Sequence, residues 1–140
     1  SLSVHVATAC TPSKPVSVLI MQGTKDPLVP LAGGKLGLNG SGGTVVSHGE
    51  AVEKWVKLDG CAATPVREHI PDNARDGTSV DVAIYTGCAD GSEVRDYVVV
   101  NGGHAWPGGK QYLPEVLIGK TTRNLDASET IWEFFSKHRR

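Results

Sequence analysis

The sequence predicts an α/β fold in which a mostly parallel sheet is flanked by helices. Two short apolar runs rich in β-branched residues, 15–21 and 94–100, have the composition of buried strands. Apolar residues recur at helical spacing in two other segments, 47–58 and 126–135. The 140 residues are enough for one domain, and we expect all of 1–140 to belong to a single one.

Composition and charge argue against several classes of partner. The chain is 39% hydrophobic and 21% charged, as is ordinary for a globular protein. Its formal net charge of −1 gives no electrostatic reason to expect nucleic acid or an anionic membrane. No apolar run reaches the length of a membrane-spanning helix, and no Cys or His spacing is typical of zinc. We therefore expect no nucleic-acid, membrane or metal partner.

The first half of the chain divides into four predicted segments. Residues 1–9 alternate between apolar and polar, which predicts a short strand or an extended connector. The strand at 15–21 follows, and the six glycines between residues 31 and 44 then predict a surface loop. Ser47-His48-Gly49-Glu50 is a capping box that starts a helix ending at Asp59-Gly60. We expect Trp55 of this helix in the core and His48 in solvent.

The second half contains a predicted hairpin, a strand and a closing helix. Segments 66–70 and 80–85 are candidate strands around an Asp-Gly turn, and the strand at 94–100 follows. Residues 110–123 show no periodicity and predict a surface connection. A second capping signal, at 126–129, starts the closing helix. We expect its aromatic residues to be core residues: Trp132, Phe134 and Phe135.

Two candidate catalytic residues, Asp26 and His104, each follow a predicted buried strand. His104 lies in a glycine-rich loop, and imidazole is the side chain that titrates near neutral pH. Asp26 lies in a loop that Pro27 and Pro30 keep from becoming helical. Because open α/β sheets carry catalytic groups at the carboxyl ends of their strands, we predict His104 as general base and Asp26 as its acid. The alternative for His104 is a loop histidine bonded to backbone.

Other carboxylates and histidines are weaker candidates. Asp72 and Asp76 lie in a turn and Asp81 alternates along a strand, so none follows a buried parallel strand. His69 alternates with apolar neighbours and is expected to be structural. His138 is expected to interact with the end of the closing helix.

Several motifs along the chain resemble those of one enzyme family. They are Gly-Thr-Lys-Asp-Pro-Leu-Val-Pro at 23–30, the Trp55 helix closed by Asp-Gly-Cys, the Asp-Gly-Thr turn at 76–78, Tyr85 to Cys88, and Gly-Gly-His-Ala-Trp-Pro-Gly at 102–108. In this order they resemble the polyhydroxybutyrate depolymerase and feruloyl esterase family of secreted α/β-hydrolases. The resemblance covers nearly the whole chain but only the C-terminal part of that fold.

The resemblance implies a Ser-His-Asp triad in which His104 and Asp26 are the base and the acid. The family's nucleophile is a serine in a Gly-x-Ser-x-Gly elbow, and these residues contain no such pattern. We therefore expect residues 1–140 to be the C-terminal part of one esterase domain, with the upstream half as partner. The isolated chain is expected to be inactive.

The function implied by the resemblance is hydrolysis of carboxylic esters, outside the cell or in the periplasm and without a cofactor. The substrates implied are polyesters such as polyhydroxybutyrate, or feruloyl and acetyl esters of plant polysaccharide. A non-catalytic hydrolase-like module that binds a partner is the alternative from another class. A peptidase with the same catalytic residues is a third.

The three cysteines and Trp106 acquire a role from the resemblance or from their position. The resemblance implies a disulfide between Cys61 and Cys88, against the alternative that both are small buried hydrophobic residues. Cys10 would then pair with the upstream half or be free. Trp106, two residues after His104, is expected either to form the wall of a substrate pocket or to anchor the loop by packing.

Overall fold

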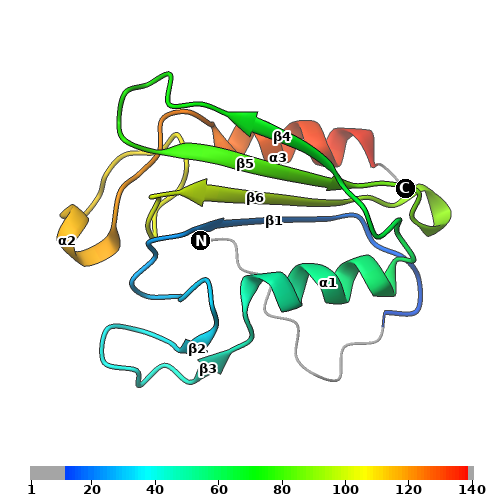
Figure 1. Cartoon of the computed structure of the whole chain (residues 1–140), viewed down its shortest axis with the longest axis horizontal. Coiled ribbons are helices and arrows are strands. Elements are labelled where there is room, and N and C mark those ends of the chain that lie inside the picture. The colour runs from blue at the N-terminus through cyan, green and yellow to red at the C-terminus, as the bar shows by residue number, and fades with distance from the viewer. Residues whose placement is uncertain (1–11, 139–140) are drawn as a thin grey trace.

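A computed structural model of the protein describes residues 12–138. The strand predicted at 1–9 and the pairing of Cys10 lie outside these residues. The main sheet has four strands in the spatial order β1-β6-β5-β4, as Figure 1 shows. Their bounds are Val18–Gly23 for β1, Val66–Ile70 for β4, Ser79–Tyr85 for β5 and Val94–Val100 for β6.

The sheet is mixed, which corrects the expectation of a mostly parallel one. β1 and β6 are parallel, with Val18 opposite Val94 and Gly23 opposite Val99. β4–β5 and β5–β6 are both antiparallel. The reason is the length of the connections: short turns join β4, β5 and β6, whereas the long segment between β1 and β6 includes a helix. The α/β character of the fold therefore comes from the parallel pair β1–β6 and from the connection between these strands, which contains α1.

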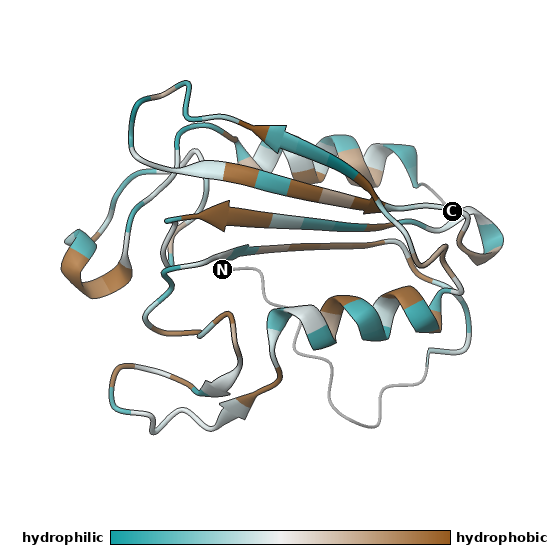
Figure 2. Cartoon of the chain, viewed as in Figure 1, coloured by the Kyte–Doolittle hydropathy of each residue, from teal (hydrophilic) through white to brown (hydrophobic). Residues whose placement is uncertain are grey.

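Both predicted helices form where their capping signals begin. Helix α1 spans His48–Leu58, and the Ser47 hydroxyl accepts a hydrogen bond from the Glu50 amide while the Glu50 carboxylate accepts one from the Ser47 amide. Helix α3 spans Ala127–Lys137, and Asp126 accepts from two amides of its first turn. Figure 2 shows apolar and polar residues alternating around α1, as expected for a helix with one face on a sheet.

The two helices pack on opposite faces of the sheet. Because successive strand residues point to opposite faces, Val18 and Ile20 of β1 pack with Trp55 of α1. Leu19 and Met21 belong instead to the cluster that contains Phe134 of α3. The prediction that Trp55 is a core residue is therefore confirmed.

The aromatic residues of α3 do not all reach the core. Phe134 is fully buried, whereas Trp132 and Phe135 are 68% and 50% exposed, so the prediction for these two is wrong. The buried stripe runs through Ala127, Ile131 and Phe134, and the other two aromatic residues lie beside this stripe. The helix carries a wider apolar face than the described sheet covers.

Four short elements occur outside the strands and helices that the sequence predicts. β2, Gly34–Lys35, and β3, Thr44–Val45, form a two-residue antiparallel ladder in the glycine-rich loop. Helix α2, Glu115–Ile118, is a single turn in the connection before α3, and Ala89–Gly91 form a 3-10 turn between β5 and β6. None of the helices within residues 12–138 is both long and apolar enough to cross a membrane.

A disulfide joins Cys61 to Cys88, as the resemblance implies. Cys61 lies three residues after the end of α1, and Cys88 follows β5. The bridge therefore ties the C-terminal end of the helix to the connection that leads into β6.

We expect loss of this disulfide to lower the free energy of unfolding by about 3–4 kcal/mol, because the bridge closes a loop across 27 residues of sequence. The measurement is urea unfolding of the full-length protein and of its Cys61→Ser, Cys88→Ser double variant. The reduced wild type should unfold at the same urea concentration as the double variant. Equal stability of the oxidised wild type and the variant would contradict the expectation.

Candidate active site

The parallel pair β1–β6 brings two loops together at the carboxyl ends of its strands. The Thr24 amide donates to the Val99 carbonyl at 3.0 Å, and the Lys25 amide donates to the Gly102 carbonyl at 2.8 Å. In return, the Asn101 amide donates to the Thr24 hydroxyl at 2.9 Å. The first residues of both loops are thus fixed to each other before either reaches its candidate catalytic residue.

Glycine makes this close approach possible. A Cβ atom on Gly23 would lie 2.3 Å from the Gly102 carbonyl oxygen, and one on Gly103 would lie 2.1 Å from the Ile118 carbonyl oxygen. Both distances are well below van der Waals contact, so any side chain would force the loops apart.

The structure brings Asp26 and His104 into a direct hydrogen bond. His104 Nδ1 lies 2.9 Å from Asp26 Oδ2; the carboxylate is fully buried and the imidazole is 26% exposed. The other carboxylate oxygen accepts from the amides of Leu28 and Val29, both at 2.8 Å. A carboxylate held on both oxygens orients the imidazole. With its Nδ1 proton donated to Asp26, a neutral His104 presents Nε2 as an acceptor.

The segment around α2 supports the His104 loop from the other side. The Gly103 amide donates to the Lys120 carbonyl at 2.8 Å, and the His104 amide donates to the Ile118 carbonyl. The Tyr112 hydroxyl donates to the His104 carbonyl at 3.1 Å. The backbone on both sides of the imidazole is therefore held by hydrogen bonds to residues 112–120.

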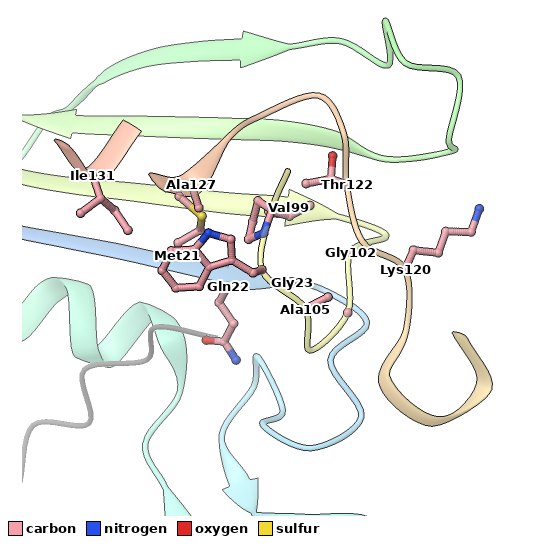
Figure 3. Close-up of a pocket in the computed structure, with 13 residues that line it drawn as sticks. Met21, Gln22, Gly23, Val99, Gly102, Ala105, Lys120, Thr122, Ala127 and Ile131 are labelled. Atoms are coloured by element: carbon pink, nitrogen blue, oxygen red, sulfur yellow. The ribbon is translucent and has the colours of Figure 1, made fainter. Parts of the chain in front are cut away.

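A small pocket of about 20 Å³, room for roughly one water molecule, lies next to this loop at the ends of β1 and β6. Figure 3 shows Met21 and Val99 contributed by these strands, Ala105 by the His104 loop, and Ile131 by α3. Trp106 also lines the pocket, and its Nε1 donates to the Ser128 hydroxyl at 3.1 Å. The indole thus contacts the pocket and also fixes the loop to α3, so both expected roles for Trp106 remain open.

The rival carboxylates lie elsewhere, in a polar cluster that holds the β4–β5 turn. Asp72 accepts from the amides of Asp76 and Gly77, and Asp76 accepts from the amide and hydroxyl of Thr78. Asp76 also accepts from the Arg123 amide at 2.7 Å, which links the turn to the segment before α3. These two carboxylates hold the backbone of the β4–β5 turn in place.

The hydrogen bonds of this cluster lower the pKa of both carboxyls. Burial by itself raises the pKa of Asp76, but hydrogen bonds from Thr78 and Arg123 and the Arg123 charge outweigh it. The pKa of Asp72 is likewise lowered, because amide hydrogen bonds outweigh burial and the nearby Asp76 charge.

We expect the cluster to make stability fall at acid pH. Because both pKa values are lower in the folded state, the contribution is fully present above the unfolded value of about 3.9. It is lost as the pH drops through the folded values. Urea unfolding between pH 6 and pH 2 should show a shallower acid loss for Asp76→Asn than for wild type, with Asp81→Asn as control. Parallel curves for Asp76→Asn and wild type would contradict this.

The remaining histidines occupy three different environments. His69 pairs across the hairpin with Asp81 at 2.6 Å, in solvent, and His138 Nδ1 bonds the Phe134 carbonyl at the end of α3. His48 is buried, which corrects the expectation that it faces solvent. The sequence did hold a signal for the burial of His48. Each of the two buried strands carries a polar residue, Gln22 in β1 and Asp96 in β6, and a buried polar residue needs a hydrogen-bond partner.

Within the described residues, no group of three or more His, Cys, Asp and Glu side chains is placed to hold a metal ion. No protein-family model matches the chain. The chain is similar to the curated protein "Putative esterase NocK" of Nocardia uniformis subsp. tsuyamanensis, with 30% identity over 131 residues. The match covers 88% of this chain but 38% of that relative, so the chain spans well under half of the relative's length.

This similarity supports an esterase-like family and suggests ester hydrolysis. The more specific assignment, to polyhydroxybutyrate depolymerases and feruloyl esterases, rests on the motifs alone and belongs to the proposal below.

Proposed function

We propose that this chain supplies the acid and the base of a serine carboxylic-ester hydrolase whose nucleophilic serine lies upstream of residue 1. The observation that carries the proposal is the hydrogen bond between His104 and the buried Asp26, at the ends of two parallel strands. Similarity to an esterase supports the same reaction class.

In the proposed mechanism the serine hydroxyl attacks the ester carbonyl while His104 Nε2 takes its proton. The tetrahedral intermediate then releases the alcohol, which receives that proton from His104, and leaves an acyl-enzyme. Water attacks the acyl group in the second half, His104 again takes the proton, and the acid and the free serine are regenerated. Asp26 fixes the tautomer and stabilises the imidazolium. Upstream backbone amides would hold the oxyanion, and the reaction needs no cofactor.

An uncovered side of the fold supports an upstream half as the partner. Within residues 12–138, β1 pairs with β6 alone, so its other edge offers unpaired backbone groups. Val16, Trp132 and Phe135 leave apolar surface exposed, and a pocket along β1 is lined by Val16, by Trp55 of α1 and by Phe135 of α3. Trp55 Nε1 is buried there without a hydrogen-bond partner among the described residues. Further strands and helices of the same domain would cover these groups.

We also propose a substrate class and a location. The substrates are polyesters such as polyhydroxybutyrate, or feruloyl and acetyl esters, with Trp106 as one wall of the acyl or aromatic pocket. Trp106 is 39% exposed and lies two residues after the candidate base, which supports its role as a wall of the substrate site. The disulfide supports an extracellular or periplasmic enzyme, since such bonds persist in oxidising compartments.

His104→Ala and Asp26→Asn in the full-length protein test the two assigned roles. We expect His104→Ala to remove nearly all ester turnover and Asp26→Asn to lower kcat by about 10⁴-fold, the loss typical of a triad whose histidine has the wrong tautomer. The measurement is hydrolysis of p-nitrophenyl butyrate and methyl ferulate. Asp81→Asn, in the exposed pair with His69, is the matched control and should keep wild-type turnover. Turnover near wild type in His104→Ala would refute the assignment.

Labelling with a fluorophosphonate tests the upstream serine. We expect one adduct on the full-length protein, at a serine outside residues 1–140, and no adduct on the 14.8 kDa chain alone. His104→Ala should greatly slow the labelling, because the serine loses its base. A full-length protein that takes no label would instead favour the non-catalytic module that binds a partner.

A further inference from the structure

A buried chain of hydrogen bonds leads from the α1 face of the sheet to the loop that holds Asp26. His48, the first residue of α1, has a side chain that is 6% exposed. Its Nε2 lies 2.6 Å from Asp96 Oδ1 of β6, and its Nδ1 lies 2.9 Å from Gln22 Oε1 of β1. Gln22 Nε2 donates to the Val29 carbonyl at 2.8 Å, and the Val29 amide donates to Asp26. The chain therefore ends on the carboxylate that orients the candidate base.

Chemistry fixes the direction of the hydrogen bonds that Gln22 makes in this chain. The Val29 carbonyl only accepts, so Gln22 must turn its amide nitrogen to Val29 and its amide oxygen to His48. His48 Nδ1 is then a donor. Its Nε2 forms a short hydrogen bond with a carboxyl oxygen of Asp96, 2.6 Å away. The two ring nitrogens therefore have one fixed partner each, Gln22 on one side and Asp96 on the other.

The N-terminus of α1 is also held to the same loop through its backbone. The His48 amide donates to the Leu31 carbonyl at 2.9 Å. A Cβ atom on Gly33 would lie 2.7 Å from the Ser47 nitrogen, so the loop and the helix start are in direct contact. His48 thus holds residues 29–31 by its backbone directly and by its side chain through Gln22.

Burying the polar groups of His48 and Asp96 adds little net stability, because removing both groups from water costs about as much free energy as their attraction returns. What the pair adds is direction, since both ring nitrogens of His48 and both amide atoms of Gln22 have fixed partners. We propose that Asp96, His48 and Gln22 are positioning residues that fix the Asp26 loop and so orient His104. The effect of these residues on turnover rests on the proposed esterase function. Their effect on the position of the Asp26 loop does not depend on that function.

Gln22→Glu in the full-length protein is the sharpest test. Glutamate keeps the size and the acceptor toward His48 but sets an oxygen against the Val29 carbonyl in place of the amide donor. We expect kcat to fall about ten- to a hundredfold with KM nearly unchanged, as for a misplaced catalytic group. The NMR resonance of the His104 Nδ1 proton should shift or broaden. His48→Gln, whose two donors sit on one nitrogen and so cannot replace both Nδ1 and Nε2, should change both readouts in the same direction.

His69→Gln is the matched control. The His69–Asp81 pair has the same 2.6 Å separation but is more than half exposed and lies on the hairpin. Its loss should leave turnover and the His104 proton resonance unchanged. Folded Gln22→Glu and His48→Gln proteins with wild-type kcat and an unmoved His104 resonance would overturn the proposal.

Two readouts separate this proposal from the esterase function. A wild-type protein that hydrolyses no ester defeats the proposed function, yet the His104 resonance still reports whether Gln22→Glu disturbs the Asp26 loop. Imidazole ¹⁵N spectra of the wild type need no variant, so they decide the hydrogen-bond scheme even if both variants unfold. We expect His48 Nδ1 to be protonated, and an unprotonated Nδ1 would overturn the scheme.

Discussion

The parallel pairing of β1 with β6 is the constraint on which the candidate site depends. Asp26 and His104 are 78 residues apart in sequence, yet each follows a strand of this pair by a few residues. The register sets the loops side by side, and Gly23 and Gly102 let their backbones touch. Helix α2 and the β4–β5 turn also contact the His104 loop: the Ile118 carbonyl accepts from the His104 amide, and the Gly77 carbonyl accepts from the Asn101 side chain.

The two faces of the sheet differ in what they contribute. The α3 face is an apolar cluster around Phe134 that supplies most of the burial. The α1 face is apolar near the start of the strands, around Trp55, and becomes polar toward their carboxyl ends, where His48 lies between Gln22 and Asp96. Hydrophobic contacts tolerate small displacements, whereas hydrogen bonds specify direction. The polar end of this face is the one next to the site.

Much of this arrangement was predictable from sequence because it is encoded locally. The capping box fixed the start of α1, and β-branched runs fixed β6, so the positions of Asp26 and His104 after strands followed. The predictions that were wrong concern residues whose neighbours in the fold are distant in sequence. Periodicity cannot tell whether Trp132 faces a covered surface, nor that His48 meets Asp96, since burial and partners are decided by tertiary packing. The prediction of a mostly parallel sheet was wrong because the length of the connection between two strands, and not their composition, decides whether they run parallel or antiparallel.

The two edges of the sheet are unlike. At the β4 edge, Arg67, Glu68 and His69 are all exposed, and charge along a short edge strand discourages pairing with another chain. β1, by contrast, has no charged residue, and its first four residues, 18–21, are all apolar. A further strand could therefore pair with the sheet at β1 more readily than at β4. A segment paired with the β1 edge would protect the chain from aggregation as well as extend its sheet.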